Sequence, residues 1–288
     1  MRKVWIFGDS TSADYGDSPF QYQQSWTYFL KSQLSENIEY ENVAVAGKTL
    51  KWFNFCAEYQ EGKITKNVAK DSLWAKILQK VKSDDLFVFF VGGINDHGQI
   101  NPDQYRPNPD GDYIIDDYFQ IFGNREVFMY VGEGFGTHSF YTIRSTVEEY
   151  VEILTDMINA VKAKGAIPLL VRGTGKYYMR KNNNFDVFPT SHEYMAVLPQ
   201  IAENTNAYYL DVGSVFENGF KTNGYAFMME NYFMSKSAVT RLNKRFGLEK
   251  ECNYNDNCHH NIDGAKHVYD IFAEQLKNSN YPLKDYLK

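Results

Sequence analysis

Short runs of β-branched and aromatic residues alternate with amphipathic helical patterns along most of this chain. In 145–165 the apolar residues recur every three or four positions, Ser145 and Glu148 have the spacing of a capping box, and Gly165 can end the helix. Alternation of this kind is typical of a mostly parallel sheet with helices on both faces. The pattern predicts strands at 3–7, 38–45, 86–91, 166–171 and 207–212, and helices at 25–34, 71–82, 145–165 and 264–277.

Two regions, 97–144 and 213–255, lack a clean period. Each follows a predicted strand end or precedes the final helix. We therefore expect both to lie over the edge where the strands end, since loops of this length are uncommon unless they serve a function. A chain of 288 residues can bury one large core. The prediction is a single domain, 1–288, with insertions near 97–144 and 213–255 over the functional edge.

Charge and hydropathy exclude some classes of partner. The net charge of −6 offers no basic surface for nucleic acid, and the apolar run at 86–91 is too short to span a membrane. The first residues enter a strand pattern without a signal peptide, so either the protein stays inside the cell or the sequence is a trimmed form. Aromatic residues make up 16% of the chain, which suits sugar rings but also serves to fill a core.

Residues that carry chemistry stand at the predicted strand ends. Ser10 follows the first strand in "GDST", Gly47 follows the second in "AVAGKT", and Asn95 follows the third in "GIND". Asp256 and His259, in "DNCH", stand before the final helix. The carboxyl ends of parallel strands meet at one edge of a sheet, so these groups should converge there. Acyl transfer needs such a set: a hydroxyl nucleophile, an imidazole base with a carboxylate, and donors for an oxyanion.

These four stretches resemble, in order, the motif blocks of the SGNH or GDSL-type hydrolases. They are most similar to the rhamnogalacturonan acetylesterases and related carbohydrate esterases, and the match runs from Ser10 to His259. Any single block would be a weak signal, but four in order at strand ends or a helix start are specific. The resemblance implies a flavodoxin-like α/β fold, a three-layer α/β/α sandwich with a five-stranded parallel sheet.

The resemblance also assigns the catalytic residues. Ser10 would be the nucleophile. The family's base stands five residues before the glycine at the helix start, so Gly264 selects His259, with Asp256 as its orienting carboxylate. We expect the side chain of His260 to point elsewhere, to solvent or to the rim of the site.

Three groups would form the oxyanion hole: the N–H groups of Ser10 and Gly47 and the side-chain amide of Asn95. Asp9 and His97 are candidate substrate-binding residues. The resemblance implies no cofactor.

The cysteines and a cluster of aspartates leave other site types open. The chain has 3 cysteines, and Cys252 could bridge Cys258 in an oxidising compartment. These two with His259 and His260 match no common zinc spacing, so we expect no metal there. The group Asp110, Asp112, Asp116 and Asp117 is expected to be a solvated acidic face, with a calcium site as the alternative.

The resulting functional hypothesis is a serine esterase that removes O-acetyl groups from a plant cell-wall polysaccharide, pectin (rhamnogalacturonan) or xylan. Its expected partner is an acetylated polysaccharide or oligosaccharide, with no nucleic acid and no membrane. The polymer substrates of the resembling family lead us to expect secretion, and we expect a monomer. The alternatives are a lipase, lysophospholipase or thioesterase of the same fold, and a catalytically inactive glycan-binding module.

Overall fold

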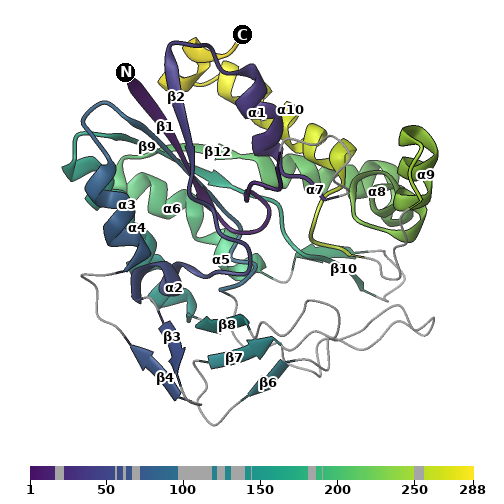
Figure 1. Cartoon of the computed structure of the whole chain (residues 1–288), viewed down its shortest axis with the longest axis horizontal. Coiled ribbons are helices and arrows are strands. Elements are labelled where there is room, and N and C mark those ends of the chain that lie inside the picture. Colours follow the sequence, from purple (N-terminus) through teal and green to yellow (C-terminus); the bar gives the residue numbers. More distant parts are fainter. Residues whose placement is uncertain are drawn as a thin grey trace.

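A parallel β-sheet lies at the centre of the computed structural model (Figure 1). The structure describes residues 1–16, 23–55, 57–60, 63–66, 72–96, 119–121, 127–130, 140–143, 145–180, 186–189, 191–249 and 256–288. Within these residues the central sheet has five strands in the order β2-β1-β5-β9-β12, and every neighbouring pair is parallel. The strands are β1 (Arg2–Gly8), β2 (Ile38–Asn42), β5 (Leu86–Val91), β9 (Ile167–Arg172) and β12 (Tyr208–Asp211). The predicted α/β sheet is confirmed.

Helices cover both faces of this sheet (Figure 1), which makes a three-layer α/β/α arrangement. Alternate residues of β1 enter opposite cores: Val4 and Ile6 join one hydrophobic cluster, and Trp5 and Phe7 join the other. The first face is covered by α1 (Trp26–Gln33), α7 (Val212–Asn223), α8 (Tyr225–Tyr232) and α10 (Ile262–Lys277). The second is covered by α2 (Leu50–Phe55), α3 (Leu73–Lys80), α4 (Val147–Ala163) and α6 (Leu198–Thr205).

The start of α4 differs from the prediction by one residue. The N-cap is Thr146, whose hydroxyl accepts a hydrogen bond from Glu149 N, while the Glu149 carboxylate accepts one from Thr146 N. The predicted pair Ser145 and Glu148 was therefore wrong. Ser145 is buried instead, and its hydroxyl donates to Asp96 at 3.3 Å. Tertiary contact with the β5 loop thus decides which of two adjacent hydroxyls caps the helix.

The region 213–255, read as aperiodic from the sequence, contains the rest of α7, then α8 and α9 (Lys236–Phe246). The sequence YAFMMENY of α8 spreads its apolar residues around the helix, which hides the helical period. Helix α9 is mostly polar, and its buried face consists of Ala238, Val239 and Leu242. Ser235 caps it by accepting from Ala238 N. The single-domain boundary and the placement of both insertions over the edge stay predictions.

No helix in the part of the chain that the structure describes has both the length and the apolar character needed for a bilayer span. His97 and the aspartates of 110–117 lie outside the described residues.

The additional strands form antiparallel pairs: β3 (Ala57–Gln60) with β4 (Lys63–Lys66), β7 (Val127–Tyr130) with both β6 (Phe119–Ile121) and β8 (Phe140–Ile143), and β10 (Tyr177–Arg180) with β11 (Asp186–Pro189). The short helices are α5 (His192–Ala196) and η1 (Pro282–Tyr286).

Candidate active site

Ser10 stands in a tight turn directly after β1. The Asp9 carboxylate accepts hydrogen bonds from both the N–H and the hydroxyl of Thr11, each at 2.8 Å. The Asp9 carbonyl accepts from Ser12 N at 3.0 Å. The end of β1 approaches β5 so closely that a side chain does not fit at Gly8, where a Cβ would lie 2.6 Å from the Phe90 carbonyl oxygen. The result is a rigid turn at the carboxyl edge that holds the Ser10 side chain in place.

The loop before α10 brings an imidazole to this turn. His259 Nε2 lies 2.8 Å from Ser10 Oγ, although the two residues are 249 positions apart in the sequence. On its other side, His259 Nδ1 lies 2.6 Å from Asp256 Oδ2. Asp256 Oδ1 accepts from the backbone N–H groups of Cys258 at 2.8 Å and His259 at 3.0 Å. Ser10, His259 and Asp256 therefore form a continuous hydrogen-bonded line.

Burial and charge act in opposite directions on this line. Burial lowers the pKa of His259, but attraction from the Asp256 carboxylate outweighs it and leaves the pKa raised above the ordinary 6.5. Burial raises the pKa of Asp256, yet His259 and the two backbone donors reverse the effect and leave it well below its usual value. For Asp9 burial prevails over the Thr11 hydrogen bonds, so its pKa is raised. Asp256 is thus an anion at neutral pH, placed to stabilise the positive charge that His259 gains when it accepts a proton.

The other two predicted oxyanion donors stand on adjoining loops. Gly47 occupies the left-handed region, with φ +73°, and a Cβ there would meet no atom of the described residues within 4 Å. Asn95 Nδ2 donates to the Lys48 carbonyl at 3.2 Å, which joins the loop after β5 to this turn. Val45 N donates to the Gly8 carbonyl at 3.2 Å. The three loops are thus bonded to one another, and the oxyanion role of Gly47 and Asn95 stays a prediction.

Asp96 is hydrogen-bonded to segments next to these loops. It is buried, and its Oδ1 accepts from Leu50 N at 2.9 Å and from the Ser145 hydroxyl at 3.3 Å. Its own N–H donates to the Gly93 carbonyl at 3.1 Å. One carboxylate therefore links the β5 loop to the starts of α2 and α4.

Asp9 and His97 were predicted from the sequence to bind substrate, and the hydrogen bonds described above do not test either role. The Asp9 carboxylate is buried and used by Thr11, and His97 lies outside the described residues. Both roles stay predictions.

His260 is placed differently from the prediction. Its side chain is 2% exposed, and its ring lies 5.2 Å from that of Phe216 and 5.1 Å from that of Phe233. The expectation that it points to solvent or the rim was therefore wrong. Residues 233 and 260 form an isolated antiparallel bridge, and this pairing turns the second histidine into the core. Burial, aided by the nearby His259, lowers the pKa of His260 to about 3.

Contacts that the sequence did not indicate hold the His259 loop on two sides. Tyr177 N donates to the Asn257 carbonyl at 3.0 Å, and Asn257 Nδ2 donates back to the Tyr177 carbonyl at 2.7 Å. Met234 N donates to the His259 carbonyl at 3.0 Å, and its carbonyl accepts from Asp256 N at 2.7 Å. The stretch 256–259 is therefore clamped between the start of β10 and the link from α8 to α9.

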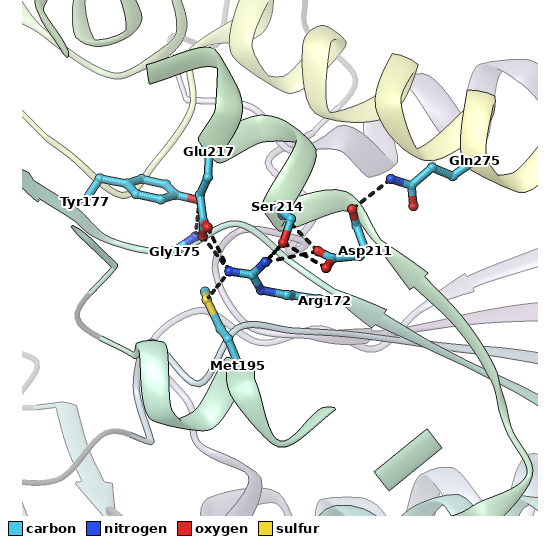
Figure 2. Close-up of polar contacts among 8 residues, drawn as sticks. All are labelled: Arg172, Gly175, Tyr177, Met195, Asp211, Ser214, Glu217 and Gln275. Carbon is cyan, nitrogen blue, oxygen red and sulfur yellow. Dashed lines mark hydrogen bonds and ion pairs between the residues drawn. The ribbon is translucent and has the colours of Figure 1, made fainter. Parts of the chain in front are cut away.

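A charged network lies beside that clamp (Figure 2). The Arg172 guanidinium, at the end of β9, donates to both Glu217 oxygens at 2.8 Å and to Asp211 at 3.2 Å, and it also contacts the Ser214 hydroxyl. Burial lowers the pKa of Arg172, but the two carboxylates outweigh it, so the guanidinium keeps its charge. The network joins the ends of β9 and β12 to α7, whose Phe216 and Phe220 pack against the Tyr177 ring.

The cysteine and metal alternatives both involve Cys258, next to His259. Cys258 is a free, buried thiol, and burial raises its pKa well above the ordinary value. Cys252 lies outside the described residues. Across the residues that are described, no group of three or more His, Cys, Asp and Glu side chains is arranged to hold a metal ion.

This geometry agrees with a comparison against protein-family models. Residues 4–272 match the model of the GDSL-like lipase/acylhydrolase family. The chain belongs to this family. Membership makes it a hydrolase of the GDSL type, and it accounts for the order of the four motifs along the chain.

The individual proteins to which this chain is similar are distant in sequence. The chain is 22% identical over 282 residues to a Bacillus subtilis protein named probable rhamnogalacturonan acetylesterase YesY, covering 98% of this chain and 95% of that one. The crystal structure of the Bacillus subtilis protein YXIM is 21% identical with a TM-score of 0.54, and the match covers 96% of this chain but 56% of that longer one. LAE5, an alpha/beta hydrolase enzyme from the metagenome of Lake Arreo, is 15% identical over 95% of this chain and 94% of its own, with a TM-score of 0.50. The two solved structures support the fold alone.

Proposed function

We propose that this protein hydrolyses carboxylic esters through an acyl-enzyme on Ser10. The observation that carries the proposal is the position of the His259 imidazole, which lies within hydrogen-bond distance of Ser10 Oγ through Nε2 and of Asp256 through Nδ1. His259 takes the hydroxyl proton as Oγ attacks the ester carbonyl, and it then gives that proton to the leaving alkoxide. A water molecule, deprotonated by the same imidazole, attacks the acyl-enzyme and releases the acid and free Ser10.

The negative charge that develops on the carbonyl oxygen needs donors that are already in place. We assign this role to the N–H groups of Ser10 and Gly47 and to the Asn95 amide. The support is the bonding between their loops, in which Asn95 is held against the Lys48 carbonyl. Donors fixed before the reaction stabilise the oxyanion without reorganising during it.

We propose an O-acetyl group on a plant cell-wall polysaccharide, pectin (rhamnogalacturonan) or xylan, as the substrate, and an extracellular site of action. The support is the similarity to the YesY protein, which extends over nearly the whole of both chains. The GDSL family description also includes lipases, so an acyl chain longer than acetyl is the second candidate.

The chemistry is tested by Ser10→Ala. The variant removes the attacking oxygen and should lower kcat for 4-nitrophenyl acetate by about 10⁶-fold, as in other serine hydrolases. Ser32→Ala is the control, because Ser32 is an exposed serine on α1. Covalent labelling by an organophosphate should occur in the wild type and be lost in Ser10→Ala. Full turnover by Ser10→Ala, or an unlabelled wild type, would refute the acyl-enzyme, and the latter would favour an inactive glycan-binding module.

The substrate is tested separately by the acid that is released. Acetate release from acetylated pectin, xylan and mannan would identify the polymer, and acetyl and octanoyl 4-nitrophenyl esters would be compared in parallel. We expect a preference for acetyl. A preference for octanoyl would exclude the deacetylase and favour a lipase.

A further inference from the structure

Tyr15 lies five residues after Ser10 and takes no part in the acyl-transfer steps described above. Its phenol is partly buried and donates a hydrogen bond of 2.7 Å to the Ser10 carbonyl oxygen. Burial and the nearby Asp9 and Asp256 raise the pKa of Tyr15, so the phenol keeps its proton and remains a donor.

This bond acts on one particular peptide unit. The Ser10 carbonyl and the Thr11 N–H belong to the same planar peptide group. Tyr15 holds the carbonyl end, and the Asp9 carboxylate holds the N–H end at 2.8 Å. Hydrogen bonds at both ends resist rotation of the plane, which restrains the Cα–Cβ direction of Ser10.

The same phenol is connected to the other half of the site. Its oxygen is hydrogen-bonded to the Gln23 side chain, and Gln23 pairs with Asn261 in an antiparallel bridge. Next to it, Gln24 N donates to the His260 carbonyl at 3.0 Å, and Gln24 Nε2 donates to the Gly16 carbonyl at 3.1 Å. The turn that contains Tyr15 is therefore bonded to the segment that immediately follows His259.

We propose that Tyr15 is a positioning residue that fixes Ser10 relative to His259. The inference rests on the proposed esterase function. Tyr15 contacts neither the ester nor the proton that is transferred. It acts by holding the Ser10 peptide in place and connecting it to the segment beside His259. A displacement of the reacting atoms by about 1 Å lowers rates by about 100-fold, so even a small rotation of this peptide is costly.

The experiment compares Tyr15→Phe with Tyr281→Phe. Tyr281 is a matched control because its phenol also donates to a backbone carbonyl, that of Ile167 at 2.9 Å, but at the amino end of β9. Each substitution removes one oxygen and one phenol-to-carbonyl bond. With 4-nitrophenyl acetate we expect Tyr15→Phe to lower kcat by about 10–100-fold. KM should stay within about twofold, and organophosphate labelling should slow in parallel, while Tyr281→Phe keeps the wild-type kcat and KM.

Each possible result either supports or overturns the positioning role of Tyr15. If Tyr15→Phe keeps kcat within about twofold of wild type, or if both variants lose kcat equally, Tyr15 has no specific positioning role. If Tyr15→Phe does not fold, Gln23→Met removes the amide that holds the phenol, and an unchanged kcat there overturns the proposal. Wild-type turnover tests the esterase itself: an inactive wild type defeats both ideas, whereas an active wild type with an unaffected Tyr15→Phe defeats only this one.

Discussion

A carboxylate surrounded by hydrogen-bond donors lies at each end of the central sheet, yet the two carboxylates have different roles. At the amino end, Asp85 is buried and accepts from Trp5 Nε1 at 2.9 Å and from the backbone N–H groups of Lys3 and Lys82, both at 3.0 Å. At the carboxyl end, Asp256 accepts from two backbone N–H groups and from the imidazole of His259. Only the second has a donor that can gain or lose a proton near neutral pH.

The difference shows how one solution to carboxylate burial can be used in two ways. The indole and amide donors of Asp85 are permanent, so that site can only contribute to stability. Replacing one permanent donor by an imidazole, which also reaches the Ser10 hydroxyl, turns the same arrangement into a path for a proton. We therefore expect substitutions at the two ends to separate cleanly into effects on rate and effects on stability.

Among substitutions of these carboxylates and the groups around them, the largest effect should come from Asp256→Asn. The amide cannot stabilise protonated His259 and favours the wrong imidazole tautomer, so kcat for 4-nitrophenyl acetate should fall by about 10⁴-fold. The thermal midpoint should change little, because the amide oxygen still accepts from the backbone N–H groups of Cys258 and His259. A kcat close to wild type would mean that the Asp256 charge is not needed.

Asn95→Ala should have the next largest effect. Loss of one oxyanion donor costs about 2.7–4 kcal/mol of transition-state stabilisation, or roughly 10²–10³ in kcat. KM should change much less, because the oxyanion exists only in the transition state. If instead KM rose and kcat held, Asn95 would be a ground-state contact rather than an oxyanion donor.

Asp85→Ala tests the amino end. It leaves the Trp5 indole N–H and two backbone N–H groups without their acceptor. The buried indole alone should lower the free energy of unfolding by roughly 1–3 kcal/mol, and the two partly buried N–H groups add to this loss. Urea denaturation measures this loss, and kcat at 25 °C should remain that of the wild type. A large drop in kcat with the fold intact would contradict the separation of the two ends.

The smallest expected effect is a shift of the acid limb of the pH–rate profile to higher pH. Because the pKa of His259 is raised, its imidazole stays protonated to a higher pH than a free histidine and cannot accept the Ser10 proton there. The limb of kcat/KM should therefore lie above the ordinary 6.5, with activity rising as the pH rises through it. Asp85→Ala should leave the limb in place. A wild-type limb at or below 6.5 would contradict the stabilisation of protonated His259 by Asp256.

The sequence was sufficient where the physical signal is local and repeated. All five central strands and the helices at α1, α3, α4 and α10 follow from hydrophobic periodicity. Strand ends of a parallel sheet share an edge, so the motif order was enough to predict that Ser10 and His259 meet.

Sequence patterns failed where a contact between distant segments decides the outcome. Asp96 engages Ser145 and leaves the capping of α4 to Thr146, and the bridge to Phe233 turns His260 inward. Nothing in the local sequence marks Tyr15 or Arg172. The Tyr15 bond depends on how the loop after β1 turns back on Ser10, and the Arg172 partner Glu217 lies 45 residues along the chain.

The aromatic enclosure of His260 has a practical consequence for anyone who follows this site by spectroscopy. Two histidines in succession would ordinarily give overlapping signals that both drift as acid is added. Here burial lowers the pKa of the second ring to about 3, so its NMR resonances should move little near neutral pH while those of its neighbour titrate. Within this pair, a chemical-shift titration should therefore come from the imidazole that faces the serine.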